Sequence, residues 1–344
     1  MNSPAADVIR WGFLGAGFVA SRAMAPAVHA ADGAVLQRVA ARDIERAASL
    51  GPVHSSSSYA DVVEADDVDA VYISLTNEAH EEWVMASLAA GKHVLCEKPL
   101  SMTAASVMRL MTAQASTSPH SPLLIEALWY RWHPRFARTL ELLASGVVGT
   151  VHSVQARFCF QGVPLDNYRL DPKRGGGAIL DVGPYVLDAA LMAHRAGGAG
   201  SADELEIVTR DLVRGDPGGM GDVTLSLDAE IRMGRTTAQL SISIDRPAQQ
   251  EFRVEGDQGT LSWTGGEAFT VWKQACELEL VNVDGLRIET FEPVDPYRLM
   301  VEQSMRSMAG REHSLMPLTD SFLLARGLDV LQGSPATPLS GSGG

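Results

Sequence analysis

The sequence predicts an α/β protein of two domains, with a doubly wound parallel sheet in the first and a mostly antiparallel sheet in the second. Three observations support this prediction. Apolar runs alternate with helical stretches up to about residue 128, strand-like runs dominate the second half, and a chain of 344 residues is too long for one ordinary core. We expect domains at residues 7–128 and 129–335, followed by a flexible tail at residues 336–344.

A glycine-containing turn at residues 15–20 follows the first expected strand, which spans residues 8–14. The turn leads into an alanine-rich helical stretch. Gly15 permits a tight turn, Gly17 lets a pyrophosphate approach the backbone, and Ala20 is small enough for close packing of helix on strand. The expected dinucleotide site therefore comprises Gly15, Gly17, Phe18, Val19 and Ala20.

The second expected strand, at residues 35–41, ends at a basic residue. Arg42 follows Gly17 by about 25 residues, the distance at which such folds meet the adenosine ribose. An acid there would repel a 2′-phosphate, whereas Arg42 can pair with that phosphate and stack on adenine, so the sequence favours NADP over NAD. Asp43 has two open interpretations, as the cap of a helix that begins at Ile44 or as a ribose ligand.

Three further apolar runs, at residues 68–74, 93–97 and 123–127, complete the expected parallel sheet. A polar loop at residues 55–58 precedes them. A helix that ends near Gly91 separates the first two, and a helix at residues 103–115 with a linker at 116–122 separates the last two. Four residues after the first run are expected to face the cofactor: Leu75, Thr76, Asn77 and His80. Asn77 is interpreted equally as a helix cap, and His80 equally as a structural histidine.

The run at residues 93–99 ends in an acid, a base and a proline. Because its apolar part is typical of a buried parallel strand, Glu97 and Lys98 fall at the carboxyl end, where open α/β sheets bind ligands. Pro99 prevents the ladder from continuing. We expect a catalytic Lys98 and a cofactor contact from Glu97; the alternative is a salt-bridged strand end before a loop.

Aromatic and basic residues cluster at residues 129–134, where the two expected domains join. Arg131 and His133 are candidates for a substrate pocket, whereas Trp129 and Trp132 are interpreted equally as pocket or core. After a helix at 135–144, strands are expected at 151–160, 223–231, 236–244, 251–255, 260–263 and 269–272, and helices at 297–308 and 320–331. Such a sheet has one covered face and one polar face, and the polar face can serve as a dimer surface.

Residues 171–188 carry the second candidate catalytic segment. Three consecutive glycines, at positions 175–177, form a loop at a helix start. Asp181 and Tyr185 are four residues apart, so they are expected on one face of that helix, both pointing toward whatever Lys98 addresses. A phenol has a reference pKa of about 10, and a nearby cation such as Lys98 favours the phenolate. The alternative is an amphipathic helix with a buried tyrosine and a capping aspartate.

Composition excludes several classes of partner. The chain has 28 Lys plus Arg against 42 Asp plus Glu and a net charge of -14, which argues against nucleic acid or an anionic membrane surface. Cys96, Cys159 and Cys276 show no paired spacing, so we expect neither disulfides nor a metal site, and a cytoplasmic location. We identify no signal peptide and no bilayer-spanning apolar run.

With these motifs in place, the sequence resembles the Gfo/Idh/MocA family of NAD(P)-dependent oxidoreductases. The resemblance rests on residues 15–20, on Glu97-Lys98-Pro99, on Glu126 with the run at residues 130–134, and on residues 175–185. It implies a Rossmann domain, a second α/β domain with a large open sheet, acid–base residues at Lys98 and Tyr185, a cofactor contact from Glu126, and a sugar-like substrate near Tyr168. A dimer or tetramer is expected.

Tyr185 stands where inositol dehydrogenases carry a histidine. The sequence is therefore similar to the branch of glucose-fructose oxidoreductase and dimeric dihydrodiol dehydrogenase, and inositol is a less favoured substrate. In that branch the matching lysine–proline bond is often cis, which we expect for Lys98–Pro99.

The expected activity is hydride transfer between nicotinamide and a hydroxyl or carbonyl carbon of a sugar, cyclic polyol, keto-sugar or dihydrodiol. Tyr185 would exchange the proton, Lys98 would hold the oxygen, and Asp181 would orient both, with Lys98 as direct donor the close alternative. Two other functions stay open: a redox-neutral glycosidase or lyase that uses its cofactor transiently, and a non-catalytic sugar or cofactor sensor.

Overall fold

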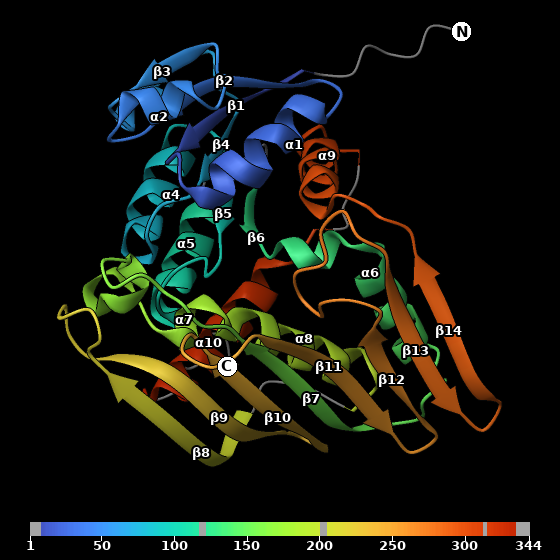
Figure 1. Ribbon diagram of the computed structural model, residues 1–344. Coiled ribbons are helices and arrows are strands. Elements are labelled where there is room, and N and C mark those ends of the chain that lie inside the picture. The colour runs from blue at the N-terminus through green and yellow to red at the C-terminus, as the bar shows by residue number, and fades with distance from the viewer. Residues whose placement is uncertain (1–7, 117–121, 200–204, 312–314, 335–344) are drawn as a thin grey trace, which may run out of the picture. The chain divides into compact units, whose positions relative to one another are not determined.

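The computed structural model describes residues 8–116, 122–199, 205–311 and 315–334, which form two compact units (Figure 1). Within these ranges, the first unit is drawn from Met1–Ser101, Ser106–Trp129 and Asp295–Ser321, and the second from Met102–Ala105, Tyr130–Val294 and Phe322–Gly344. The expected linker at 116–122 and the tail at 336–344 lie almost entirely outside the described residues.

The first unit is built on a six-stranded sheet in the order β3-β2-β1-β4-β5-β6. Its strands are β1 (Ile9–Leu14), β2 (Ala34–Ala40), β3 (His54–Ser56), β4 (Ala70–Ile73), β5 (His93–Glu97) and β6 (Leu124–Ala127). All of its pairings are parallel, which confirms the predicted doubly wound sheet. The chain runs from β1 to β2 on one side and to β4 on the other, so the strand order reverses between β1 and β4, the place where such sheets bind ligands.

Short helices connect these strands. They are η1 (Ala20–Met24), α1 (Ala25–Ala30), α2 (Ile44–Ala48), α3 (Ala60–Val63), η2 (Asn77–Ala79), α4 (His80–Ala89) and α5 (Ala104–Ser116). The prediction of a polar loop at residues 55–58 is wrong in part, because strand β3 occupies His54–Ser56. This strand pairs with β2 at the sheet edge and is at most half-buried, so its serines lack the apolar alternation that signals a strand.

Helix α9 (Pro296–Met308) belongs to the first unit, although we expected residues 129–335 to form the second domain. It packs against α1 and η1, and the Tyr297 ring stacks on Trp129 with ring centroids 4.6 Å apart. Met300 and Val301 are fully buried. The sequence predicted the helix itself but not its partner, because an amphipathic pattern shows which face is buried and not against what.

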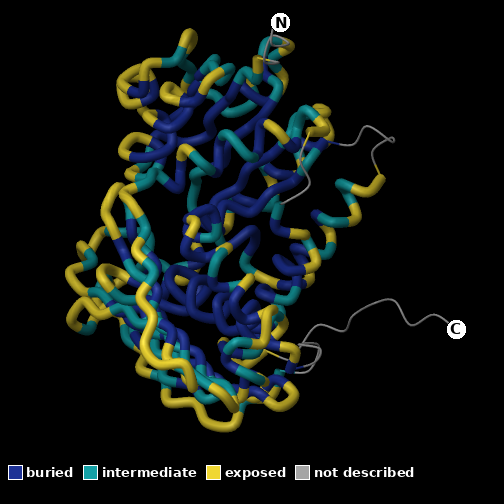
Figure 2. The backbone as a smooth tube through the Cα atoms, turned by 90° about the vertical axis from the view of Figure 1, so that its right-hand side faces the viewer, coloured by how far each residue is buried: buried dark blue, intermediate teal, exposed yellow. Residues whose placement is uncertain are grey.

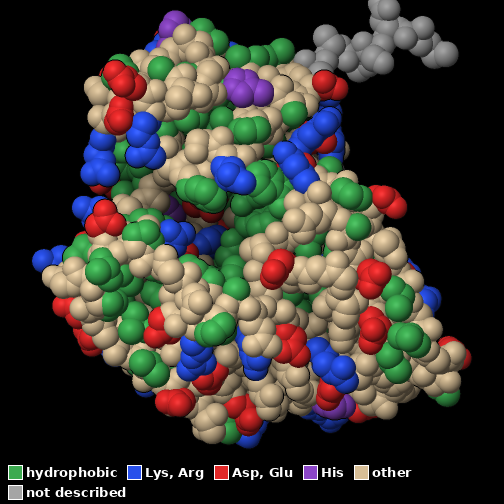
Figure 3. All heavy atoms as spheres, in the orientation of Figure 1, with side chains coloured by type: hydrophobic (Ala, Val, Ile, Leu, Met, Phe, Trp, Pro, Cys, Tyr) green, Lys and Arg blue, Asp and Glu red, His purple; other side chains and the backbone are tan. Residues whose placement is uncertain are grey.

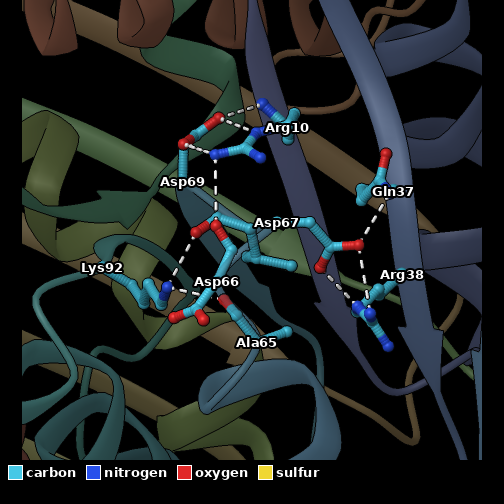
Figure 4. A network of polar contacts seen from close by, with 9 residues as sticks. Arg10, Gln37, Arg38, Ala65, Asp66, Asp67, Asp69 and Lys92 are labelled. Carbon is cyan, nitrogen blue, oxygen red and sulfur yellow. Dashed lines mark hydrogen bonds and ion pairs between the residues drawn. The ribbon is translucent and has the colours of Figure 1, made fainter.

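An ion pair and two lysine hydrogen bonds hold the amino-terminal ends of the parallel strands together (Figure 4). Arg10 in β1 binds the Asp69 carboxylate through Nε at 2.9 Å and Nη2 at 2.7 Å, just before β4 begins. Lys92, just before β5, donates to the carbonyls of Ala65 and Val68 at 2.7 and 2.9 Å. These contacts stabilise one end of the sheet and leave the carboxyl ends for ligands.

The second unit contains an eight-stranded sheet in the order β14-β13-β12-β11-β7-β10-β9-β8. Its strands are β7 (Val151–Cys159), β8 (Leu205–Gly215), β9 (Val223–Met233), β10 (Thr236–Ser243), β11 (Gln249–Gly256), β12 (Gly259–Thr264), β13 (Cys276–Asn282) and β14 (Gly285–Phe291). Strands β7 and β10 pair in parallel and the other neighbours are antiparallel, which confirms the mostly antiparallel prediction.

Helix α8 (Gly183–Ala196) packs on β7 and β10, and its residues 183–194 are buried. Figure 2 draws buried residues of the chain in dark blue and exposed ones in yellow. The remaining helices of this unit are α6 (Pro134–Ala144), α7 (Ala178–Asp181), η4 (Tyr168–Leu170), η5 (Pro172–Arg174) and most of η3 (Trp129–Trp132) and α10 (Leu318–Gln332). The opposite face of the sheet holds a polar hollow of about 440 Å³ that Arg157, Asp228 and Glu230 help to line. One face is therefore covered and one is polar, as predicted.

Four strand assignments from the sequence need correction. Residues 269–272 form a loop in which the Phe269 N–H donates to Gln250 Oε1 at 2.7 Å, while the buried ring joins an aromatic cluster. Strands β8, β13 and β14 were missed. Strands β8 and β14, the two edge strands of this sheet, are half-buried at most, so neither shows the alternation of buried and exposed residues on which the prediction relied.

No single described helix is long and apolar enough to cross a membrane, although the bent pair Pro172–Asp181 and Gly183–Ala196 meets the length and composition test together. On the face drawn in Figure 3, basic and acidic side chains are interspersed.

Candidate active site

The glycine turn after β1 is fixed by close backbone contacts. Gly15 has φ +99°, and a Cβ there would lie 2.3 Å from the Ser74 carbonyl oxygen at the end of β4. Its N–H donates to the Ala40 carbonyl at the end of β2. A Cβ on Gly17 would meet nothing within 4 Å, so the backbone is open on that side, and the buried Ala20 lets the helix start close to the strand. These features fit a dinucleotide pyrophosphate.

At the end of β2, the two charged residues do different things. The Asp43 carboxylate accepts from the N–H groups of Glu45 and Arg46 at 3.0 and 3.2 Å, so it caps α2, one of its two predicted roles. Arg42 is exposed, and within the described chain its guanidinium has no hydrogen-bond or ion-pair partner. It is therefore available to an anionic ligand.

Arg46 is a residue that the sequence analysis missed. Its Nη2 donates to the Ala16 carbonyl at 2.7 Å, which ties α2 to the glycine turn. The signal was the presence of a second arginine four residues after Arg42, since two arginines near an adenosine ribose indicate a phosphate.

His80 is held between two loops at the carboxyl edge of the sheet. Its fully buried ring places Nδ1 2.8 Å from the Pro99 carbonyl and Nε2 3.3 Å from the Leu75 carbonyl. Burial lowers its pKa, although the two carbonyls act in the opposite direction, and the ring connects the loops after β4 and β5. This contact favours the structural interpretation of His80. Leu75 and Thr76 are half-buried, and Asn77 is buried at the start of η2.

Two buried acids support the turn that carries Lys98. Glu97 Oε1 accepts from the Tyr72 hydroxyl at 2.7 Å, and Glu126 Oε1 accepts from the Leu100 N–H at 2.9 Å. Burial raises the pKa of Glu97, although Lys98 and Tyr72 act in the opposite direction. The Lys98–Pro99 peptide bond is cis, as the resemblance implied. Lys98 follows β5 directly and is half-buried.

In the second unit, Asp181 and Tyr185 lie on different helices, which corrects the prediction of one continuous helix. Helix α7 ends at Asp181, α8 begins at Gly183, and the two segments bend by 45°. Pro184 explains the break, because it lacks an N–H and its ring clashes with the preceding turn of a helix. The Asp181 carboxylate accepts from Arg169 Nε at 2.7 Å.

Tyr185 sits in an aromatic cluster. Its ring centroid lies 5.2 Å from that of Phe158, 5.7 Å from Tyr130 and 6.1 Å from Phe269, and 6% of the residue is exposed. Such packing fixes the ring direction, which is a requirement for a residue that exchanges a proton with substrate.

One turn further along α8, Asp188 forms a second network that sequence reasoning missed. The Tyr130 hydroxyl donates to Asp188 at 2.5 Å, and Arg131 binds both oxygens of the same fully buried carboxylate. Burial and the Asp188 charge raise the pKa of Tyr130 well above its usual value. The signal was the spacing of Asp188 three residues after Tyr185.

The other predicted pocket residues have structural contacts. His133 caps α6 by accepting from the Arg135 N–H at 3.1 Å, and burial lowers its pKa to about 4. Trp129 stacks in the first unit, Trp132 is buried, and Tyr168 lies beneath the Arg169 guanidinium at 5.1 Å. Substrate contacts from Arg131, His133 and Tyr168 stay predictions, as does the meeting of Lys98 with Tyr185, because these two residues belong to different units.

Comparison with protein families decides the wider assignment. Residues 9–119 match the model described as an oxidoreductase family with an NAD-binding Rossmann fold, and residues 136–262 match the GFO/IDH/MocA C-terminal domain. The chain is also 34% identical over 336 residues to D-xylose 1-dehydrogenase (NADP(+)) 2 of Haloferax volcanii, covering 95% of this chain and 97% of that protein. The chain belongs to the Gfo/Idh/MocA family. It is an NAD(P)-dependent oxidoreductase.

Other members of the Gfo/Idh/MocA family are similar over most of their length. The dTDP-3,4-didehydro-2,6-dideoxy-α-D-glucose 3-reductase of Actinomadura kijaniata is 32% identical, covering 76% of each chain. The crystal structure of a 3-ketoreductase from that organism with NADP and TDP-benzene has a TM-score of 0.84 at 27% identity, covering 95% of this chain and 98% of that one. The trans-1,2-dihydrobenzene-1,2-diol dehydrogenase of Xenopus laevis is 30% identical, covering 73% and 74%.

Within the described residues, no group of three or more His, Cys, Asp or Glu side chains is placed to hold a metal ion. The three cysteines are buried and free.

Proposed function

We propose that this oxidoreductase transfers a hydride reversibly between NADP and a hydroxyl or carbonyl carbon of a sugar or sugar-like substrate, such as a keto-sugar, cyclic polyol or dihydrodiol. The observation that carries the proposal is the Gly15 turn, seated between β2 and β4 at the reversal of strand order, with Gly17 open in front of it. The substrate class is supported by the similarity to the xylose dehydrogenase, the keto-sugar reductase and the dihydrodiol dehydrogenase.

The preference for NADP is supported by the charges after β2. Asp43 caps α2, while Arg42 is exposed just before that cap and Arg46 lies four residues later, within α2. The Asp43 carboxylate is therefore not available to bind the ribose hydroxyls, and the guanidinium groups of Arg42 and Arg46 favour a 2′-phosphate.

The bound nicotinamide supplies or accepts the hydride, so the protein has to align the substrate carbon and move one proton. In reduction, Tyr185 gives its phenolic proton to the substrate oxygen as the carbon gains the hydride; in oxidation, the phenolate takes that proton back. Lys98 holds the oxygen, and Asp181 orients the site. Lys98 as direct proton donor stays the alternative. The buried carboxylates of Glu97 and Glu126 hold the turn that carries Lys98 through their hydrogen bonds. We also propose that both residues contact the cofactor.

Replacing Tyr185 by Phe tests this mechanism. We expect turnover to fall by a factor of about 100 to 10,000, the range for loss of a general acid–base group, with NADPH affinity unchanged in a cofactor-fluorescence titration. Tyr59→Phe is a matched control and should retain most turnover, because the Tyr59 ring packs against Trp83 and Tyr59 is not among the proposed site residues. Full turnover in Tyr185→Phe would contradict the assignment of Tyr185 as the residue that exchanges the proton.

The same assay distinguishes the other functions. A redox-neutral lyase or glycosidase would form product from a sugar panel with no net change in NADPH absorbance, and a sensor would bind NADPH without turnover. We also propose a homo-oligomer through the polar face of the second sheet, which light scattering of the purified protein tests.

A further inference from the structure

Arg169 is seated by the three-glycine loop. The Gly177 N–H donates to the Arg169 carbonyl at 2.8 Å, and a Cβ on Gly176 would lie 2.6 Å from that oxygen. Gly177 has φ +102°, a conformation that suits glycine. The glycines therefore do more than start α7: they let the loop press against the backbone of Arg169.

The Arg169 side chain is directed at Asp181. Its Nε donates to Asp181 Oδ2 at 2.7 Å, and its guanidinium lies over the Tyr168 ring at 5.1 Å. The side chain is 31% exposed and that of Asp181 10%. This contact uses Nε, and the remaining N–H donors of the guanidinium are on its two Nη atoms.

Tyr185 is kept near this ion pair by the chain itself. It follows Asp181 by four residues, across a turn in which the Tyr185 N–H donates to the Val182 carbonyl at 3.2 Å. Burial lowers the pKa of Arg169, but the Asp181 carboxylate and the phenols of Tyr168 and Tyr185 raise it above the ordinary value. Arg169 is therefore charged at every working pH. Asp181 by itself would oppose a phenolate nearby, and Arg169 compensates its charge.

We propose that Arg169 is a positioning residue for the reaction: it fixes Asp181 through Nε and supplies, from within the second unit, the positive charge that stabilises the Tyr185 phenolate. This inference rests on the proposed function. A fixed charge in a partly buried site acts more strongly than the same charge in water, and it needs no reorganisation when the proton leaves Tyr185. The role was assigned to Lys98 from the sequence, and Arg169 shares it.

The pH profile of kcat/KM in the oxidation direction tests the proposal, because that direction needs the phenolate. In Arg169→Gln we expect the ascending limb to move up by about one pH unit, with about tenfold lower activity below it. In Asp181→Asn the limb should move the opposite way, because the charge of Arg169 is then uncompensated. Arg169→Lys should restore part of the shift, and NADPH affinity should stay at the wild-type value.

Arg174→Gln is the matched control, since Arg174 is in the same loop, pairs with Asp171 at 3.4 Å and is 45% exposed. It should leave the profile unchanged. The role of Arg169 would be overturned if the ascending limb of the pH profile stayed at its wild-type position in Arg169→Gln. It would also be overturned if that limb moved in the same direction in Arg169→Gln and Asp181→Asn. Undiminished turnover in Tyr185→Phe would instead overturn the proposed function, so the two failures are distinguishable.

Discussion

At the scale of single residues, neighbours in the sequence have separate roles that side-chain contacts decide. The Asp43 carboxylate accepts hydrogen bonds from the first turn of α2, while the adjacent Arg42 is exposed. Both residues were candidates for the ribose. A carboxylate at a helix start satisfies backbone N–H groups that would otherwise lack partners, and an arginine cannot do this.

Replacing Arg42 by Ala should therefore change cofactor selectivity. We expect NADPH to bind about tenfold to a hundredfold more weakly, the effect of losing one charge-assisted contact, and NADH binding to change little. Fluorescence titration with both cofactors measures this ratio. Arg298→Ala is the control, because Arg298 lies in the same unit and pairs with Glu302 on α9. An equal loss for both cofactors would contradict a 2′-phosphate contact.

At the scale of elements, the carboxyl ends of the parallel strands carry the residues that we propose to bind the cofactor, and the amino ends carry the ion pair between Arg10 and Asp69. The glycine turn joins β1, β2 and β4 at one end through Gly15. Arg10 and Asp69 join β1 and β4 at the other. Separation of this kind lets the turn be shaped for a ligand without loss of the contacts that set strand pairing.

The two glycines of the turn should respond differently to alanine. In Gly15→Ala the new Cβ would lie 2.3 Å from the Ser74 carbonyl at a φ of +99°, so we expect a lower thermal unfolding temperature together with weak cofactor binding. In Gly17→Ala the Cβ enters open space, so stability should stay near wild type while NADPH and NADH both bind weakly. Differential scanning fluorimetry and titration separate the two effects. Normal binding in Gly17→Ala would contradict the phosphate site.

At the scale of the whole molecule, buried and surface acids give opposite pH responses. Hydrogen bonds from Arg38 hold the pKa of Asp67 at about 2, below its ordinary 3.8, although burial acts the other way. The pKa of Asp69 is also lowered, by Arg10 against the effect of burial, whereas burial raises that of Glu97. Carboxylates of the first kind stabilise the fold only while ionised.

The Asp67 contribution should therefore be present above pH 3.8 and be lost as the pH falls from 3.8 toward 2. We expect about 1 kcal/mol, because the Asp67 side chain is 30% exposed and solvent screens the pair. Asp67→Asn should lower stability at neutral pH and flatten the acid dependence of unfolding, followed by circular dichroism. Asp222→Asn, in the more exposed pair with Arg214, is the control and should change little. An unchanged acid transition in Asp67→Asn would contradict this account.

The sequence predicted what short-range patterns encode. Apolar runs of four to seven residues, glycines at a strand end and a proline after a strand identified five of the six strands of the first sheet, the glycine turn after β1 and the Lys98 position at the end of β5. Strand β3 was missed. Strands β8 and β14 were missed because neither has a buried face, and the helix break at Val182 was missed because periodicity outweighed Pro184.

By itself, then, the sequence determined the fold class, the family motifs and the residue types of the site, because periodicity and turn chemistry are local properties of the chain. Tertiary structure alone decided the partners of several side chains: His80 with two carbonyls, Asp188 with Tyr130 and Arg131, and Arg169 with Asp181. These contacts join residues from 5 to 58 positions apart, and pairing across such separations depends on how elements pack, which no local pattern records.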